Sequence, residues 1–160
     1  MSTDISFATR AHEENWLPIL ELAVEEVFEI MLGCRVKPAP SSAHTVNGEF
    51  TAMVSLAGAL CGVLTIRCDA KTAHQVATSM LGDTADSDQQ VADALGEICN
   101  MIAGNFKNKL AGTDERCLLS VPTVINGAEY SFRSIAEGDS MDTVLLFEGA
   151  PVAVRLQLQG

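Results

Sequence analysis

The segment from residue 88 to residue 110 constrains the fold most, because it reads as one long helix with two unlike faces. At about 100° per residue, its large apolar side chains fall within a sector of roughly 80°. These side chains are Val91, Leu95, Ile98, Ile102 and Phe106. The residues on the opposite side are Asp93, Glu97, Asn100 and Gly104. An apolar stripe of this width predicts a helix that packs against a core and keeps its polar side free.

The polar side has an unusual composition for a helix that only faces water. Asn is a mediocre helix former, and each Gly in a helix interior costs about 1 kcal/mol relative to Ala. Here Gly96 and Gly104 lie beside Glu97 and Asn100. Because glycine lets another backbone or a bulky group come close, the pattern favours a surface that receives a partner. A solvated face with incidental glycines is the alternative, and the residue pattern alone leaves both open.

The spacing of these polar residues resembles the signature helix of the CheC/CheX/FliY family of chemotaxis phosphatases. That signature consists of Asp or Ser, a Glu one turn later, an Asn almost one further turn along, and a Pro after a longer gap. The corresponding residues here are Asp93, Glu97, Asn100 and Pro122. The segment 15–33 also resembles the long first helix of CheX-type proteins, so the likeness extends over nearly the whole chain.

Composition excludes several classes of protein. A chain of 160 residues with 48% hydrophobic and 19% charged residues predicts one folded domain over residues 1–160, with residues 1–14 poorly ordered or partly helical. Its formal charge of −11 argues against nucleic-acid and anionic-membrane partners. No apolar run approaches the roughly 20 residues that span a bilayer, and the N-terminus lacks signal-peptide features. We therefore expect a cytoplasmic protein with a protein or small-molecule partner and no membrane insertion.

The cysteines and histidines show no metal-binding or nucleophile pattern. The five cysteines contain no Cys-x-x-Cys pair, and the three histidines are scattered without a ligand spacing. The cysteines are Cys34, Cys61, Cys68, Cys99 and Cys117. We expect them to be buried as small apolar side chains, and we expect no metal site built by this chain.

An earlier helix is predicted from about residue 17 to residue 32. Pro18 suits its first turn, and Gly33 suits its end. Its four acidic residues could be mistaken for a catalytic carboxylate cluster, but no Asn follows them at the signature spacing. These residues are Glu21, Glu25, Glu26 and Glu29. We interpret them as the solvated side of the helix.

Two helices and six extended segments complete the prediction. Asp69 caps a helix over residues 70–81, which Gly82 ends, and Ser87 begins the helix that carries the signature. Strands are expected over residues 34–38, 49–56, 60–68, 116–121, 143–147 and 152–158. Four of the strands form two hairpins, each with a Gly-Ala pair at its turn, which suggests a duplication with pseudo-twofold arrangement. The result is an α+β fold, a CheC/CheX-like antiparallel sheet of two hairpins plus further strands with helices packed on one face.

The resemblance implies a hydrolase that removes the phosphoryl group from the phospho-aspartate of a CheY-like response regulator receiver domain. It assigns Asn100 to the attacking water and Glu97 to the Lys that receivers carry beside their phosphorylation site. An amide suits the first task because it can accept from water and donate to a phosphoryl oxygen. Asp93, Gly96 and Gly104 are the expected partner-binding residues. The reaction needs little beyond positioning, because an acyl phosphate is already labile.

The resemblance has three further implications. The chain needs no cofactor of its own, because the receiver brings Mg²⁺. A homodimer forms through the sheets, and the final strand, residues 152–158, offers an apolar edge for it. A single site is expected, as in CheX, because the earlier segment 71–80, taken as the counterpart of the signature helix, has no Glu followed by Asn.

Two other functions stay open. One is a catalytically silent adaptor or switch-complex module, which binds a receiver without releasing phosphate. The other is a magnesium-dependent hydrolase that uses Asp93 and Glu97 on small phosphate esters. The second is disfavoured, because two acids on an exposed helix rarely make a sufficient metal site.

Overall fold

The computed structural model describes residues 16–39, 48–58, 61–110, 117–127 and 140–158. The predictions for residues 1–14 and for the strand positions 60 and 116 lie outside the described residues. The three predicted helices are present as α2 (Leu17–Leu32), α3 (Ala70–Leu81) and α4 (Asp88–Lys109). None of the helices in the described part of the chain combines the length and apolarity that crossing a bilayer requires.

The helices end where local chemistry stops them. Gly33 and Gly82 follow α2 and α3 in the left-handed conformation, with φ of 64° and 72°, which glycine adopts without a Cβ penalty. At the start of α3, the Asp69 carboxylate accepts a hydrogen bond from the Thr72 backbone N–H at 2.7 Å. At the start of α4, Ser87 accepts one from the Gln90 N–H at 3.2 Å. These caps satisfy backbone groups that the first turn leaves without helical partners.

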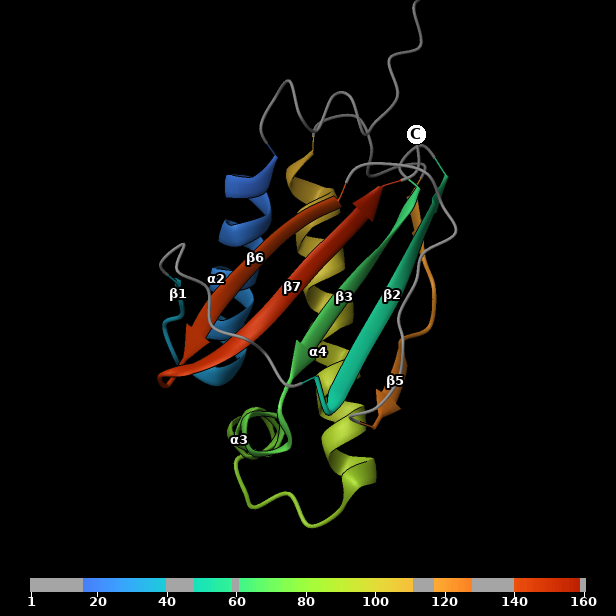
Figure 1. Ribbon diagram of the computed structural model, residues 1–160. Helices are drawn as coiled ribbons and strands as arrows, with labels where there is room; N and C mark the ends of the chain where they lie inside the picture. The colour runs from blue at the N-terminus through green and yellow to red at the C-terminus, as the bar shows by residue number, and fades with distance from the viewer. Residues whose placement is uncertain (1–15, 40–47, 59–60, 111–116, 128–139, 159–160) are drawn as a thin grey trace, which may run out of the picture.

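The described strands form one antiparallel sheet. They are β1 (Lys37–Pro38), β2 (Phe50–Gly58), β3 (Gly62–Cys68), β4 (Cys117–Leu119), β5 (Thr123–Asn126), β6 (Ser140–Phe147) and β7 (Ala150–Leu158). Their order is β1-β6-β7-β3-β2-β4, and β5 pairs with β2 beside β4. Helices α2 and α4 lie side by side on one face of this sheet, and α3 lies at one end (Figure 1). The predicted α+β architecture is therefore confirmed.

The final strand does not lie at an edge. β7 pairs with β6 on one side and with β3 on the other, so the prediction that it offers a dimer edge is wrong. The alternation of apolar and polar residues shows that one face of a strand is covered, but it does not show how many neighbouring strands it has. In the described part of the sheet, the outer positions belong to β1 and to β4 with β5. The homodimer itself stays a prediction.

The strand order has the pseudo-twofold character that the two hairpins suggest. β3 and β7 pair at the centre, with β2 and β6 outside them. In the first half of the chain β1 pairs with β6 of the second half, and in the second half β4 and β5 pair with β2 of the first half. The same relation matches α2 with α4, which run in opposite directions (Figure 1). The counterpart of the signature helix is therefore α2 and not the segment 71–80 in α3. Since α2 contains no Asn, this correction leaves the expectation of a single site unchanged.

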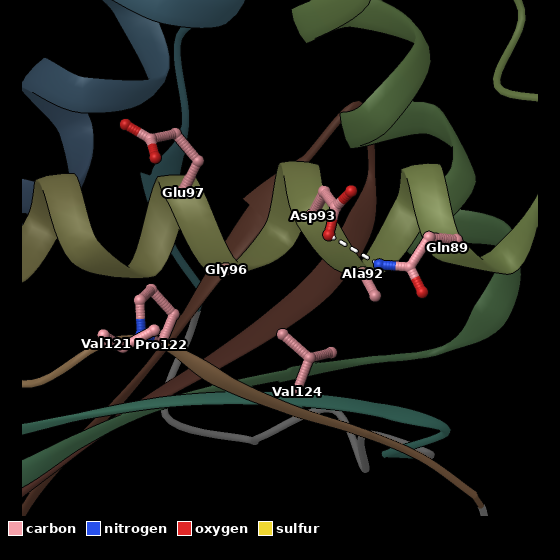
Figure 2. Close-up of a pocket in the computed structure, with 8 residues that line it drawn as sticks. All are labelled: Gln89, Ala92, Asp93, Gly96, Glu97, Val121, Pro122 and Val124. Carbon is pink, nitrogen blue, oxygen red and sulfur yellow. Dashed lines mark hydrogen bonds between the residues drawn. The ribbon is translucent and has the colours of Figure 1, made fainter.

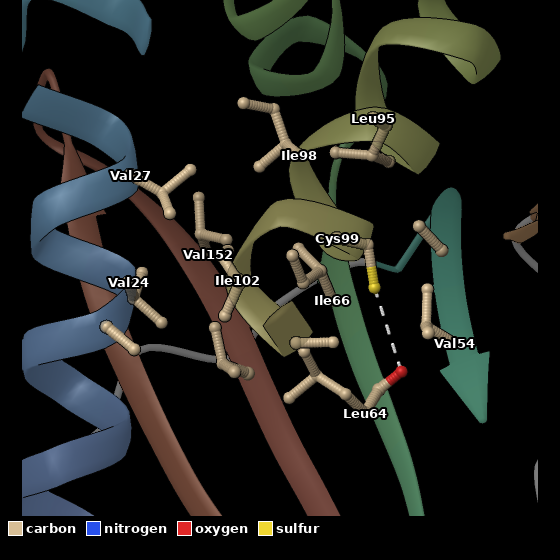
Figure 3. Packing of buried hydrophobic residues seen from close by; sticks show 14 of the residues in the cluster. Val24, Val27, Val54, Leu64, Ile66, Leu95, Ile98, Cys99, Ile102 and Val152 are labelled. Atoms are coloured by element: carbon tan, nitrogen blue, oxygen red, sulfur yellow. Dashed lines mark hydrogen bonds between the residues drawn. The ribbon is translucent and has the colours of Figure 1, made fainter. Parts of the chain in front are cut away.

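The core lies between the two long helices and the sheet. The five residues of the predicted α4 stripe are each no more than 1% exposed. Figure 3 shows three residues of this stripe, Leu95, Ile98 and Ile102, on the helix above the sheet, with Cys99 facing Leu64 of β3. Burial of these aliphatic side chains stabilises the fold by roughly 1.5–3 kcal/mol each, and it fixes which side of α4 faces outward.

The cysteines follow the prediction only in part. Cys68, Cys99 and Cys117 are buried, whereas Cys34 and Cys61 are partly exposed. The Cys99 thiol donates to the Leu64 carbonyl oxygen at 3.7 Å (Figure 3). Burial raises the pKa of both Cys68 and Cys99 to about 12, so these two thiols stay protonated at neutral pH and act as packing groups.

Candidate functional site

The outer face of α4 carries both predicted catalytic side chains. Glu97 is exposed, and Asn100 lies almost one turn further along and is partly exposed. Within the described residues, neither side chain has a hydrogen-bond or ion-pair partner. An acid and an amide are thus held by one rigid helix with their polar atoms free to meet a ligand.

Glu97 lies in a hollow between α4 and the segment that leads into β5. The hollow has a volume of about 500 Å³. Its lining includes Asp93, Gly96 and Glu97 from α4 and Val121, Pro122 and Val124 from the opposite wall (Figure 2). Gln89 donates a hydrogen bond from Nε2 to the Asp93 carboxylate at 2.8 Å, which orients that acid along the helix. The hollow therefore presents two carboxylates one turn apart.

Asn100 lies in a second hollow, further along α4 and on the side of α2. This hollow has a volume of about 430 Å³. Its lining includes Asn100 and Gly104 from α4, Glu26 and Ile30 from α2, and Leu119 from β4. The predicted site residues Asp93, Gly96, Glu97, Asn100 and Gly104 are thus distributed over two neighbouring hollows.

A β-bulge shapes the wall of the first hollow. Met53 pairs with Thr123 and Leu56 pairs with Leu119, so the two β2 residues 54–55 face the three residues 120–122. Ser120 secures the bulge, since its Oγ accepts from the Ser55 N–H at 2.9 Å and its own N–H donates to the Ser55 carbonyl at 2.9 Å. The extra residue turns the strand toward α4. The sequence prediction contained the strand up to this point but did not include β5.

Pro122 packs directly on Gly96 because of this bulge. A Cβ added to Gly96 would lie 3.2 Å from the Pro122 Cβ and 3.3 Å from the Val124 Cγ2, which is tighter than ordinary contact. The small size of Gly96 is therefore required by the chain's own packing, and contact with a partner stays a prediction for this residue. Gly104 differs, since an added Cβ would lie 3.8 Å from Leu119 Cδ1, at ordinary contact distance.

A polar cluster that the sequence prediction missed ties α2 to α4 beside the second hollow. The Glu26 carboxylate accepts from Lys109 Nζ at 2.8–2.9 Å and from Asn105 Nδ2 at 2.9 Å, and Asn105 also donates to the Ala23 carbonyl at 3.2 Å. The hydrogen bonds from Lys109 and Asn105 hold the pKa of Glu26 below its ordinary value. The interpretation of Glu26 as part of a solvated helix side is incomplete: its side chain is 37% exposed, but it also ties α2 to α4. The sequence does not predict this, because the adjacency of α2 and α4 is a tertiary feature.

The acidic residues of this face do not form a metal cage within the ranges that the structure describes. No group of three or more His, Cys, Asp or Glu side chains comes together there. Asp93 and Glu97 offer two carboxylates, and the first is already engaged by Gln89.

Comparison with known proteins identifies relatives of this chain. Residues 50–144 match the family model described as chemotaxis phosphatase CheX. The chain is 26% identical over 117 residues to the CheY-P phosphatase CheX of Thermotoga maritima, over 70% of this chain and 76% of the relative.

Solved structures share the fold. The crystal structure of the chemotaxis protein CheX from Vibrio vulnificus has a TM-score of 0.77 at 21% identity and covers 90% of this chain and 96% of its own. A chain of the CheX-CheY-BeF3-Mg²⁺ complex from Borrelia burgdorferi has a TM-score of 0.73 at 22% identity and covers 91% of this chain and 98% of its own.

Proposed function

Because this chain belongs to the chemotaxis phosphatase CheX family, we propose that it hydrolyses the phospho-aspartate of a CheY-like receiver domain on the open face of α4. The Thermotoga maritima relative is a CheY-P phosphatase, and the Borrelia burgdorferi relative is held in a complex with CheY. The beryllofluoride in that complex stands in chemically for a phosphoryl group. The protein is thus a response-regulator phosphatase, and its partner is a CheY-like receiver.

The observation that carries the site assignment is the free, outward-facing pair of Glu97 and Asn100 on one helix. In the proposed reaction, a water oxygen attacks the phosphorus and the bond to the aspartate oxygen breaks. The products are inorganic phosphate and the regenerated carboxylate of the receiver. The protein therefore has to hold a water in line and need not form a covalent intermediate.

Asn100 has the right donors and acceptor for that water. Its side-chain carbonyl can accept a hydrogen bond from the water, and its amino group can donate to a phosphoryl oxygen. Asn105, five residues along the same helix, cannot serve this purpose, because its amino group already donates to Ala23 and Glu26. The difference between the two amides supports Asn100 as the catalytic residue.

Glu97 has the role of pairing with a receiver cation. The family resemblance assigns that cation to the Lys beside the phosphorylation site. A carboxylate in a hollow about to be covered by a protein partner forms a stronger pair than one in open water, because docking removes solvent. Asp93, held by Gln89 in the same hollow, is the proposed second docking acid.

The receiver supplies Mg²⁺ in this proposal, as the composition of the Borrelia burgdorferi complex supports. The metal would neutralise phosphoryl charge, and this chain would supply the water-positioning amide and the docking acids. The proposed reaction is cytoplasmic.

The function is tested by mixing a phosphorylated CheY-like receiver with the protein and following loss of the acyl phosphate. The proposal predicts faster loss at catalytic amounts of protein, with no activity on a simple phosphate ester. Receiver binding without faster loss would support the adaptor alternative and reject the phosphatase.

A further inference from the structure

Two large aliphatic side chains are exposed on either side of the proposed catalytic pair. Ile30 of α2 is 77% exposed, and Val121 of the β-bulge is 84% exposed. Ile30 lines the same hollow as Asn100, and Val121 lines the same hollow as Glu97. Isolated apolar residues are common on protein surfaces, but these two bracket one site from two different elements.

Each of these side chains is carried by a firmly held segment. Val121 precedes Pro122, whose ring packs on Gly96, and the Ser120–Ser55 hydrogen bonds fix the bulge on its other side. Ile30 lies one turn after Glu26, which binds Lys109 of α4. Rigid apolar groups lose little entropy on association, so they make efficient anchors in an interface.

We propose that Ile30 and Val121 are the two apolar anchors that a receiver domain buries when its phospho-aspartate reaches Glu97 and Asn100. The proposal rests on the proposed function and extends it to the affinity of the complex. We assign a receiver domain as the partner that covers Ile30 and Val121. A domain that brings its acyl phosphate to Glu97 and Asn100 also has to cover these two residues, because they line the same two hollows. The acids between the anchors complement the cationic side chain of such a partner.

The anchors contribute binding that is equal before and during the reaction, because neither touches the reacting atoms in this arrangement. Their loss should therefore raise KM and leave kcat unchanged. Removal of Asn100 should lower kcat instead.

The experiment compares Ile30→Ala and Val121→Ala with Leu118→Ala. Leu118 is 76% exposed on β4 beside the bulge. Because its neighbour Leu119 packs on the helix side, alternation along the strand directs Leu118 to the other face of the sheet. This control matches Ile30 in exposure and Val121 in chain location.

Two measurements are made on a receiver that the wild-type protein binds. The first is the dissociation constant for that receiver loaded with beryllofluoride and Mg²⁺, and the second is the steady-state release of phosphate. We expect roughly tenfold weaker binding for Ile30→Ala, several-fold weaker binding for Val121→Ala, and the product of the two factors in the double variant. Leu118→Ala should bind as the wild type does.

Wild-type affinity in both anchor variants would overturn the inference and leave the phosphatase proposal standing if the wild type releases phosphate. If the wild type releases no phosphate and the anchor variants bind the receiver more weakly than it does, the anchors would be supported and the phosphatase proposal rejected. A change of self-association in Ile30→Ala or Val121→Ala, seen by sedimentation with unchanged receiver affinity, would overturn the inference in favour of a second copy as the occupant.

Discussion

Gly96 and Pro122 are packed so closely that a methyl group added to Gly96 would lie 3.2 Å from the Pro122 Cβ. The first residue belongs to the helix that carries the proposed catalytic pair, and the second belongs to the bulge at the edge of the sheet. This contact sets the distance between the helix and the wall of the Glu97 hollow. It also explains why a residue with poor helix propensity is found in the middle of α4.

The two glycines of α4 should respond differently to alanine. Gly104→Ala gains helix propensity at ordinary contact distances, so the free energy of unfolding should rise by up to about 1 kcal/mol. Gly96→Ala has the same gain but must displace Pro122 and Val124, and such overpacking costs about 1–3 kcal/mol. Chemical denaturation should therefore find Gly96→Ala less stable than Gly104→Ala, and equal stabilities would contradict the packing account.

The receiver affinity of Gly104→Ala tests the proposed partner contact at that residue. If a receiver approaches the backbone at Gly104, the more stable variant should bind the receiver several-fold more weakly. Affinity equal to that of the wild type, measured by titration with a beryllofluoride-loaded receiver, would remove Gly104 from the partner-binding residues.

Glu97→Gln should weaken the encounter with the receiver. Loss of the charge removes the proposed pair with a receiver Lys, so kcat/KM should fall about tenfold or more at low ionic strength. The difference from the wild type should shrink as salt screens the charges. Glu25→Gln on α2 makes the same change in net charge outside both hollows, and an equal effect in that variant would show that only overall charge matters.

The cluster of Glu26, Lys109 and Asn105 should make stability depend on pH. Its partners lower the folded-state pKa of Glu26 from the ordinary value of 4.5. The stabilisation is therefore present above pH 4.5 and is lost as the pH falls through the lower folded-state pKa. Glu26→Gln should reduce the free energy of unfolding at pH 7 by up to about 1 kcal/mol, and its deficit relative to the wild type should shrink on acidification. A deficit that is constant between pH 7 and pH 3 would contradict this assignment.

The sequence predicts the helices well because their boundaries are local. Asp69 and Gly82 bound α3 through a cap and a left-handed residue, and neither depends on the rest of the fold. The same holds for the two faces of α4, since the helical period separates Glu97 and Asn100 from the buried stripe.

The features that the sequence does not predict depend on contacts between distant segments. Whether β7 is a central or an edge strand depends on which strands pair with it. The alternation of apolar and polar residues along β7 would be the same in either position. β5 has four residues and is defined by its pairing with β2 beyond the bulge. The role of Glu26 depends on Lys109, which lies on another helix. The final hairpin is also tighter than expected, because Glu148 and Gly149 both take positive φ and β7 begins at Ala150.

The central claim is that the side-chain amide of Asn100 positions the attacking water, and the most direct test is Asn100→Ala. The matched control is Gln75→Ala on α3, which removes a side-chain amide outside the site. The rate of phosphate loss from a phosphorylated CheY-like receiver is followed for both variants and for the wild type. The account predicts that Asn100→Ala lowers the rate roughly 10²-fold or more, with unchanged thermal unfolding, and that Gln75→Ala retains wild-type activity. A folded Asn100→Ala protein that releases phosphate as fast as the wild type would contradict the account.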